Sequence, residues 1–188
     1  MQYLKDVVRT RILTAAVAEF KENGFSNASI RNIAEVATIS LGNIYRYYEN
    51  KEDLYLTIIS PLTKMVKQES ISSLLNEKIT LTNAMDTIVD YLLSHADEYA
   101  ILRVSETVDY NHFFTRLSEL MSKKIEQVFV AKDAENFGKI VNPKFCLIIA
   151  TGYLNAILSI INDNKDDDVI HAYVKEISKY YFQDLITD

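Results

Sequence analysis

The 188-residue sequence predicts an all-α protein of about nine helices. Apolar residues recur at the three-to-four-residue spacing of an amphipathic helix along nearly the whole chain, and no strict two-residue alternation persists. The chain has only 4 Gly and 2 Pro, too few turn residues for a many-stranded sandwich or barrel. Its composition, 48% hydrophobic and 24% charged, is that of a folded globular protein and excludes a disordered chain.

Helix start and stop signals delimit the expected elements in order. Gly24 is placed to end the first helix in a left-handed conformation. Ser29, Ser40 and Asn50 belong to the residue types that cap the N-terminus of a helix. Pro143 suits the first position of a later helix. We expect helices over residues 6–23, 29–37, 41–48, 51 to beyond 61, 81–94, 97–106, 111–136, 143–161 and 166–185.

The net charge is not spread evenly along the chain. The whole sequence carries 20 basic and 26 acidic residues, a net charge of −6, which by itself argues against a nucleic-acid partner. Residues 1–53 contain 7 basic and 7 acidic residues, so their net charge is 0. The remaining 13 basic and 19 acidic residues carry the whole −6. The acidity therefore describes the C-terminal part and does not argue against DNA binding by the N-terminal part.

The single cysteine and the apolar segment around it indicate the cellular compartment of the protein. Cys146 has no partner for an intrachain disulfide, which favours a reducing compartment, and it is expected to be a small buried side chain. The apolar segment 145–161 is interrupted by polar residues and is shorter than the roughly 20 residues that a membrane span needs. We expect a cytoplasmic protein without a membrane partner, in which this segment is a buried or interface helix.

Three short helices followed by a long one, within the first 60 residues, have the outline of a helix-turn-helix domain. In the third helix, Ile44 and Tyr48 are four residues apart and can share a buried side. Ser40, Asn43 and Tyr47 fall on a different arc and stay available to a DNA groove. Tyrosine hydroxyls and helix N-termini can bind phosphate without adding net charge. The pattern therefore indicates a DNA-reading helix that uses few lysines.

A specific series of motifs covers about thirty residues of this region. It combines Ile-Ala, Ser-x-Gly, Tyr-x-Tyr and Lys-Glu at fixed spacing and so resembles the TetR family of transcriptional regulators. The resemblance implies a homodimeric repressor that binds a palindromic operator and responds to a small-molecule effector. The matched residues are Gly24, Phe25, Ser29, Ile30, Ile33, Ala34, Ala37, Ile39, Ser40, Gly42, Tyr45, Tyr47, Tyr48, Lys51, Glu52 and Leu54.

The resemblance also implies which residues contact DNA. Ser29 and Lys51 would bind phosphates, and Tyr45 and Tyr47 would contact the DNA backbone. A base edge is a further candidate contact for Tyr45. The residues after the Ser40 cap would read bases, and the glycine among them would let the backbone approach another surface closely. Arg31 and Arg46 are each either a phosphate contact or solvated surface. The predicted DNA-binding set is Ser29, Arg31, Ser40, Leu41, Gly42, Asn43, Tyr45, Tyr47 and Lys51.

Two residues depart from the family pattern. Thr38 stands where a turn glycine is usual, and a β-branched residue tolerates positive φ poorly, so we expect this turn to be wound differently. Ala28 replaces a common threonine, which removes one candidate phosphate contact. Neither departure removes the pattern as a whole.

The predicted organisation is a DNA-binding domain over residues 1–60, whose fourth helix is shared with a ligand-binding and dimerisation domain over residues 61–188. The second domain is rich in aromatic and sulfur-containing side chains, each more often core than pocket lining. Together they would suit a small apolar or aromatic ligand. The candidate ligand-binding residues are Met65, Tyr91, Tyr99, Tyr110, Phe113, Phe114, Met121 and Tyr153.

The last two helices are the candidate dimer interface. Small residues in the first of them permit close helix approach, and the second carries a matching apolar and aromatic stripe. The alternative is a pair of internal core helices. The predicted interface residues are Ile149, Gly152, Tyr153, Ala156, Ile160, Val169, Tyr173, Ile177 and Tyr180.

Two other classes of function remain open at this stage. One is a helix-turn-helix protein that organises DNA or binds a partner without sensing a ligand. The other is an all-helical enzyme, for which the sequence offers no phosphate loop, dinucleotide fingerprint or nucleophile elbow. His95, His112 and His171 are too widely spaced to suggest a metal site, and we expect no cofactor.

Overall fold

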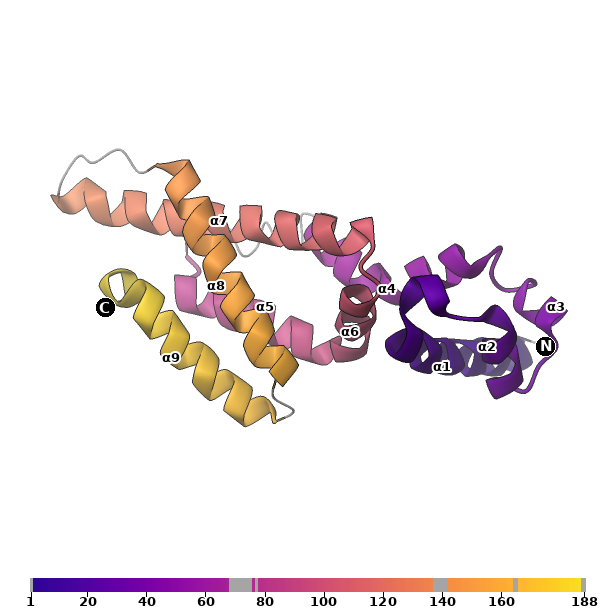
Figure 1. The fold of residues 1–188 in the computed structure, drawn as a ribbon. Coiled ribbons are helices and arrows are strands. Elements are labelled where there is room, and N and C mark those ends of the chain that lie inside the picture. Colours follow the sequence, from indigo (N-terminus) through magenta and orange to yellow (C-terminus); the bar gives the residue numbers. More distant parts are fainter. Residues whose placement is uncertain (1, 68–75, 77, 137–141, 164–165, 187–188) are drawn as a thin grey trace. The chain divides into compact units, whose positions relative to one another are not determined.

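The structure is a computed structural model that describes residues 2–67, 76, 78–136, 142–163 and 166–186. Within these residues it contains nine helices and no strand, so the predicted all-α fold is confirmed (Figure 1). The helices are α1 (Gln2–Asn27), α2 (Ile30–Val36), α3 (Leu41–Ile44), α4 (Lys51–Lys67), α5 (Leu81–Ser94), α6 (Ala96–Val104), α7 (Val108–Asn136), α8 (Pro143–Asp163) and α9 (Asp167–Ile186). The bounds expected for the last five helices are within about three residues of these.

The chain forms two compact units. The head unit consists of residues 1–64 and 95–113, and the body unit consists of residues 65–94 and 114–188. The sequence-based division at residue 60 assigned residues 95–113 to the body, whereas here they pack within the head unit. The reason is visible in the contacts of α6, which lies against α1.

The core of the head unit follows the apolar periodicity of α1. Ile12, Ala16 and Phe20 are buried on one stripe of this helix. Helix α1 lies against α2, and the Phe20 ring packs against that of Tyr55 in α4. The stripe follows the i, i+4, i+8 spacing of an amphipathic helix. This packing gives the short helices α2 and α3 a rigid base, because helices of this length are not stable alone.

Gly24 breaks α1 in a conformation that other residues rarely adopt. Its φ of 65° and ψ of 177° lie in a region that is almost exclusive to glycine. A Cβ at this position would lie 3.0 Å from the carbonyl oxygen of Val104 in α6. The predicted positive φ at Gly24 and the predicted break of the first helix there are confirmed, and a second short helical segment follows the break as far as Asn27.

The link between α6 and the rest of the head unit also uses polar bonds. The Ser105 hydroxyl accepts a hydrogen bond from the Phe25 amide at 3.1 Å. The Tyr55 hydroxyl bonds the Thr107 hydroxyl at 3.0 Å, and burial raises the pKa of Tyr55. These contacts join the end of α1 and the middle of α4 to the segment that follows α6.

In the body unit, α9 packs against both α8 and α5, and α8 and α9 lie side by side (Figure 1). Tyr153 of α8 is fully buried against Phe182 of α9, with ring centroids 5.0 Å apart. Its hydroxyl is hydrogen-bonded to that of Ser178. Cys146 is buried, as expected, and burial raises the pKa of its thiol.

Candidate nucleic-acid interface

The predicted DNA-binding residues lie on three consecutive segments of the head unit. These are the N-terminus of α2, the whole of α3 with the turn after it, and the N-terminus of α4. Ser29 caps α2 through its hydroxyl, which accepts a hydrogen bond from the Asn32 amide at 3.3 Å. Asn50 caps α4 through a bond of 2.8 Å from the Asp53 amide. Two of the three predicted side-chain caps, Ser29 and Asn50, are thus confirmed.

The turn between α2 and α3 contains a left-handed threonine. Thr38 has a φ of 56°, so the prediction that a β-branched residue would force a different winding is wrong. The turn keeps the conformation that glycine usually supplies because neighbouring groups hold it. The Ile39 amide donates to the Ala34 carbonyl at 3.0 Å, and the Thr38 amide donates to the Glu35 carbonyl at 2.9 Å.

Helix α3 is shorter than predicted. It ends at Ile44 rather than at residue 48, because the following amides bond three residues back, as in the Tyr47 amide to Ile44 carbonyl contact of 2.9 Å. Ser40 occupies the N-cap position, but its side chain makes no capping bond. The expected buried pair is confirmed, with Ile44 1% and Tyr48 3% exposed.

The opposite side of α3 is open. Ser40, Gly42 and Tyr45 are exposed, Tyr45 by 50%, and Asn43 and Tyr47 are half-buried. These residues occupy the arc that the sequence pattern left free for a groove. The arrangement can present hydroxyl, amide and backbone groups to another macromolecule without adding charge.

Nothing in the described part of the chain requires a glycine at position 42. A Cβ at this position would meet no atom within 4 Å, and the backbone φ is not left-handed. The absence of a side chain therefore does not serve the packing of the described part of the chain. It leaves the exposed face of α3 free for close approach by a second surface.

The N-terminus of α2 is held by a carboxylate from α1. Glu19 is only 7% exposed, and its Oε1 accepts the Ser29 amide at 2.8 Å. Its Oε2 accepts a bond from the Asn32 side-chain amide. The Ser29 backbone amide is therefore already engaged, and its hydroxyl hydrogen is the group that a phosphate could accept.

Lys51, at the start of α4, is engaged inside the head unit. Its ammonium group donates to the carbonyls of Ser26 at 3.1 Å and Ala28 at 3.0 Å. It also lies 4.8 Å from the centroid of the Phe25 ring, over its face. An ammonium has three N–H donors, so one remains for the predicted phosphate contact. Lys51 thus ties the end of α1 to the start of α4.

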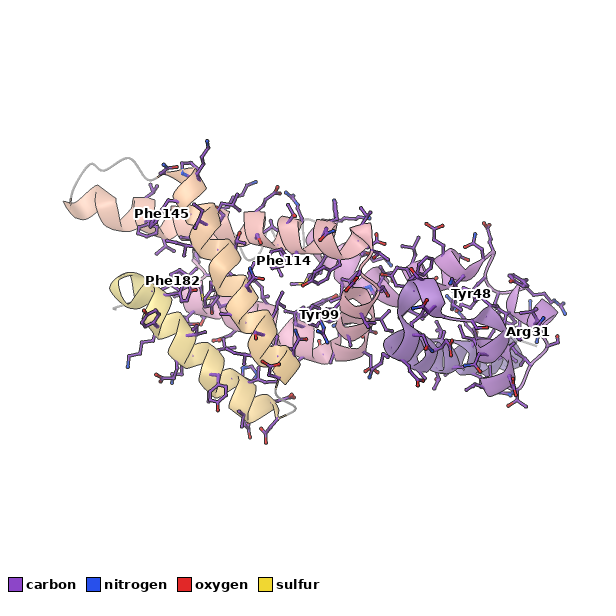
Figure 2. The ribbon with its side chains drawn as sticks, in the orientation of Figure 1. Arg31, Tyr48, Tyr99, Phe114, Phe145 and Phe182 are labelled. Carbon is purple, nitrogen blue, oxygen red and sulfur yellow. The ribbon has the colours of Figure 1, made fainter. Side chains whose placement is uncertain are left out.

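Arg31 is exposed near the N-terminus of α2 (Figure 2). Arg46 is exposed in the turn after α3. Their positions on the same three segments are compatible with phosphate contacts, and the choice between such contacts and solvated surface stays open. Arg31 and Lys51 are the cationic members of the predicted DNA-binding set, and Arg46 is a further candidate outside it.

Sequence reasoning missed two residues that position this surface. Glu19 lies seven residues after Ile12 on the buried stripe of α1, and this position in the helical period could have marked it as a buried carboxylate. Arg11 donates hydrogen bonds to the carbonyls of Ala37 and Thr38 at the end of α2. No local pattern marks Arg11, because its partners lie 26 and 27 residues further along the chain.

The candidate ligand-binding residues are divided between the two units. Tyr99, Tyr110 and Phe113 belong to the head unit. The others, in the body unit, are Met65, Tyr91, Phe114, Met121 and Tyr153. Among all eight, Met65, Tyr99, Phe113, Met121 and Tyr153 are buried (Tyr99 and Phe114 are marked in Figure 2). The assignment of these side chains to a ligand site stays a prediction.

The candidate dimer interface carries exposed apolar side chains in the single chain. On α9, Tyr173 is 53% and Tyr180 is 80% exposed. On α8, Phe145 and Ile148, which are not members of the predicted interface set, are also exposed, by 55% and 69%. Tyr153 is different, because it is fully buried within its own chain and could support an interface only indirectly. The half-buried members of the predicted set are Ile149, Gly152, Ala156, Ile160, Val169 and Ile177.

The described residues offer neither a metal site nor strong grounds for a membrane span. Among the described residues, no group of three or more His, Cys, Asp or Glu side chains could hold a metal ion. In the same part of the chain, α8 alone is long and apolar enough to cross a membrane by length and composition. The core helices of soluble proteins can have the same length and composition, so these two properties do not by themselves make α8 a membrane span.

Comparison with known proteins agrees with a helix-turn-helix regulator. Residues 12–58 match the family described as bacterial regulatory proteins, tetR family. The HTH-type transcriptional regulator YfiR of Bacillus subtilis strain 168 is 30% identical in an alignment of 142 positions that covers 65% of this chain and 68% of YfiR. The chain belongs to the TetR family of bacterial transcriptional regulators.

Two further similarities show how much of the chain resembles other known regulators. The HTH-type transcriptional regulator UidR of Escherichia coli strain K12 is 35% identical over 98 residues, 52% of this chain and 47% of UidR. The match thus spans about half the length of UidR. A TetR-like transcriptional regulator from Rhodococcus sp. RHA1 has the same fold, with a TM-score of 0.65 at 19% identity over 96% of this chain and 97% of that protein.

Proposed function

We propose that this protein is a cytoplasmic, homodimeric repressor that binds a palindromic DNA operator and is released from it by a small apolar or aromatic ligand. Family membership supports regulation of transcription. The observation that carries DNA binding is the exposed face of α3, where Gly42 has no packing role within the chain and Asn43, Tyr45 and Tyr47 stand beside it.

The contacts of this surface favour recognition by polar groups. The α2 and α4 ends are anchored within the head unit by Glu19 and Lys51, so Ser29 and the α4 N-terminus are pre-positioned against phosphates. With about 2 to 3 cationic contacts per head, a dimer should lose affinity with a log–log salt slope of about −4 to −5. A slope near −10 would mean that many more basic residues contact DNA.

The dimer component of the proposal rests on the exposed apolar residues of α8 and α9. Side chains such as Ile148 and Tyr180 would lose water contact in a symmetric pairing of these helices. Two heads brought together by a two-fold axis would read half-sites about one helical turn of DNA apart. Light scattering at micromolar concentration tests this component, and a monomer would contradict it.

The ligand component requires two states of the dimer. An effector lowers DNA affinity only if it binds more tightly to the state whose heads are wrongly spaced for the operator. Helix α4 runs from the head unit into the first residues of the body unit, so it is our candidate for transmitting the change. A panel of aromatic and long-chain apolar compounds that never changes DNA affinity would favour a regulator without a ligand.

Selection of bound DNA from a random pool tests the function as a whole. The expected result is a two-fold symmetric consensus with two half-sites. On that DNA, Asn43→Ala should change the preferred bases, whereas Tyr45→Ala should weaken binding to all sequences alike. A pool from which no sequence is enriched would overturn the proposal, and an unchanged preference in Asn43→Ala would overturn the base-reading role.

A further inference from the structure

The turn between α2 and α3 holds an unfavourable residue in a defined conformation. Thr38 and Glu106 are the two non-glycine residues with positive φ in the described part of the chain. The pair of amide bonds around Thr38, to Glu35 and Ala34, is a Schellman motif, in which the left-handed position is usually glycine. A threonine at this position is disfavoured by its Cβ and its branched side chain, so surrounding contacts must stabilise it.

Arg11 provides such contacts from a distant part of the sequence. Its Nη2 donates to the Ala37 carbonyl and, at 3.2 Å, to the Thr38 carbonyl. Both carbonyls lie at the C-terminal end of α2, where the helix dipole favours a positive charge. The guanidinium therefore binds the left-handed residue and the residue before it at the same time, and it anchors both to α1.

We propose that Arg11 is a positioning residue for DNA reading. By stabilising the left-handed conformation of Thr38, it sets the direction in which the chain leaves α2 and enters α3. Only Ile39 and Ser40 separate Thr38 from α3, so a change of φ at Thr38 would re-aim the whole reading helix. This inference rests on the proposed DNA-binding function and adds to it a residue outside the predicted DNA-contacting set.

A direct phosphate contact is the competing role for an arginine in the head unit. The two roles differ in salt dependence. A phosphate contact contributes about −0.9 to the log–log salt slope for each cation, and a dimer has two copies. A positioning residue that stays on carbonyl groups contributes nothing to that slope. Loss of affinity at constant salt slope is therefore the signature of positioning.

The test is a double-mutant cycle between Arg11→Met and Thr38→Gly in the full-length protein. Methionine keeps most of the aliphatic stem and removes the donors, and glycine removes the cost of the left-handed conformation. The readouts are affinity for the selected DNA, its salt slope, and hydrogen exchange of the Ile39 amide, which bonds Ala34. Lys5→Met removes a positive charge from an exposed position on the same helix and is the control.

We expect Arg11→Met to lower DNA affinity about tenfold with an unchanged salt slope, and to accelerate exchange at Ile39 about tenfold. Thr38→Gly should restore both to within about threefold of the wild-type values. The same tenfold loss in the Thr38→Gly background, or a salt slope reduced by about 2, would overturn the proposal. If the wild-type protein selects no DNA, the proposed function fails, and exchange at Ile39 still reports whether Arg11 holds the turn.

Discussion

The head and body units are stabilised in different ways. In the head unit, charged side chains bind helix ends: Glu19 at the start of the short helix α2, Arg11 at its end, and Lys51 at the end of α1. In the body unit, long helices pack through apolar faces, and a buried hydroxyl pair, Tyr153 with Ser178, joins α8 to α9. Short helices gain little from their own hydrogen bonds, so polar contacts between elements must fix their directions.

This difference has a functional meaning. A DNA-reading surface needs a fixed geometry on helices too short to be rigid alone, and the polar contacts of the head unit supply that geometry. The body unit needs a large apolar core and an exposed apolar face, which longer amphipathic helices provide. Substitutions that remove a single contact should therefore affect the two units differently.

The largest effect is expected at Gly24. Gly24→Ala places a Cβ in a glycine-only conformation, 3.0 Å from the Val104 carbonyl, and should lower the free energy of unfolding by about 3 kcal/mol. Gly42→Ala is the matched control, because its Cβ would meet no atom within 4 Å. Denaturant unfolding at equal protein concentration measures both, and equal losses would contradict the account of Gly24.

The buried hydroxyl of the body unit should show in the pH dependence of stability. Burial raises the pKa of Tyr153 to about 12, whereas an unfolded tyrosine titrates near 10. Between about pH 10 and pH 12 the unfolded state binds fewer protons than the folded state, so stability falls as the pH rises, by about 1.4 kcal/mol per pH unit at most. Tyr153→Phe should remove this contribution to the loss of stability at high pH. If the free energy of unfolding depends on pH in the same way in the variant and in the wild type, Tyr153 makes no such contribution.

An intermediate effect is expected at Glu19. Glu19→Gln keeps the shape of the side chain but loses the charge and one acceptor, so it should cost about 1.5 kcal/mol of stability. Because both hydrogen bonds that Glu19 accepts hold the start of α2, exchange of the Ser29 amide should accelerate more than exchange at the end of α2. Glu35→Gln, an exposed substitution on α2, provides the comparison. Unchanged exchange at Ser29 would show that Glu19 does not anchor the helix.

The smallest effect is expected at Lys51. Lys51→Met retains the apolar stem and removes two carbonyl bonds and the contact with the Phe25 ring, at a cost of about 1 kcal/mol. Lys64→Met, on the exposed side of the same helix, should leave stability within about 0.5 kcal/mol. Thermal unfolding compares the two variants, and equal midpoints would mean that the contacts of Lys51 contribute little.

The sequence was a good guide where local periodicity decides the structure. It predicted α5 at its observed bounds and the buried pair Ile44 and Tyr48, because both follow from apolar spacing. It also placed the caps Ser29 and Asn50, whose bonds are local. The predicted end of α3 was wrong. Hydrogen bonds from an amide to the carbonyl three residues back, as at the end of this helix, leave no distinct trace in the spacing of apolar residues.

Features that depend on distant partners could not be predicted in this way. The left-handed Thr38 is disfavoured by its own chemistry and is held by Arg11, which precedes it by 27 residues. The place of residues 95–113 in the head unit depends on contacts between α6 and α1 that no local pattern encodes. For the candidate site, the exposed face of α3 was predictable, and the residues that hold it in place were not.

The most direct test of the account is Gly42→Ala on the selected DNA. Within the described chain the added methyl group meets nothing within 4 Å, and alanine favours a helix over glycine, so stability should be unchanged or rise by up to about 1 kcal/mol. Because the same methyl group would stand between α3 and the DNA, affinity should fall at least about tenfold. Unchanged affinity in the stably folded variant would contradict the claim that this face of α3 meets DNA.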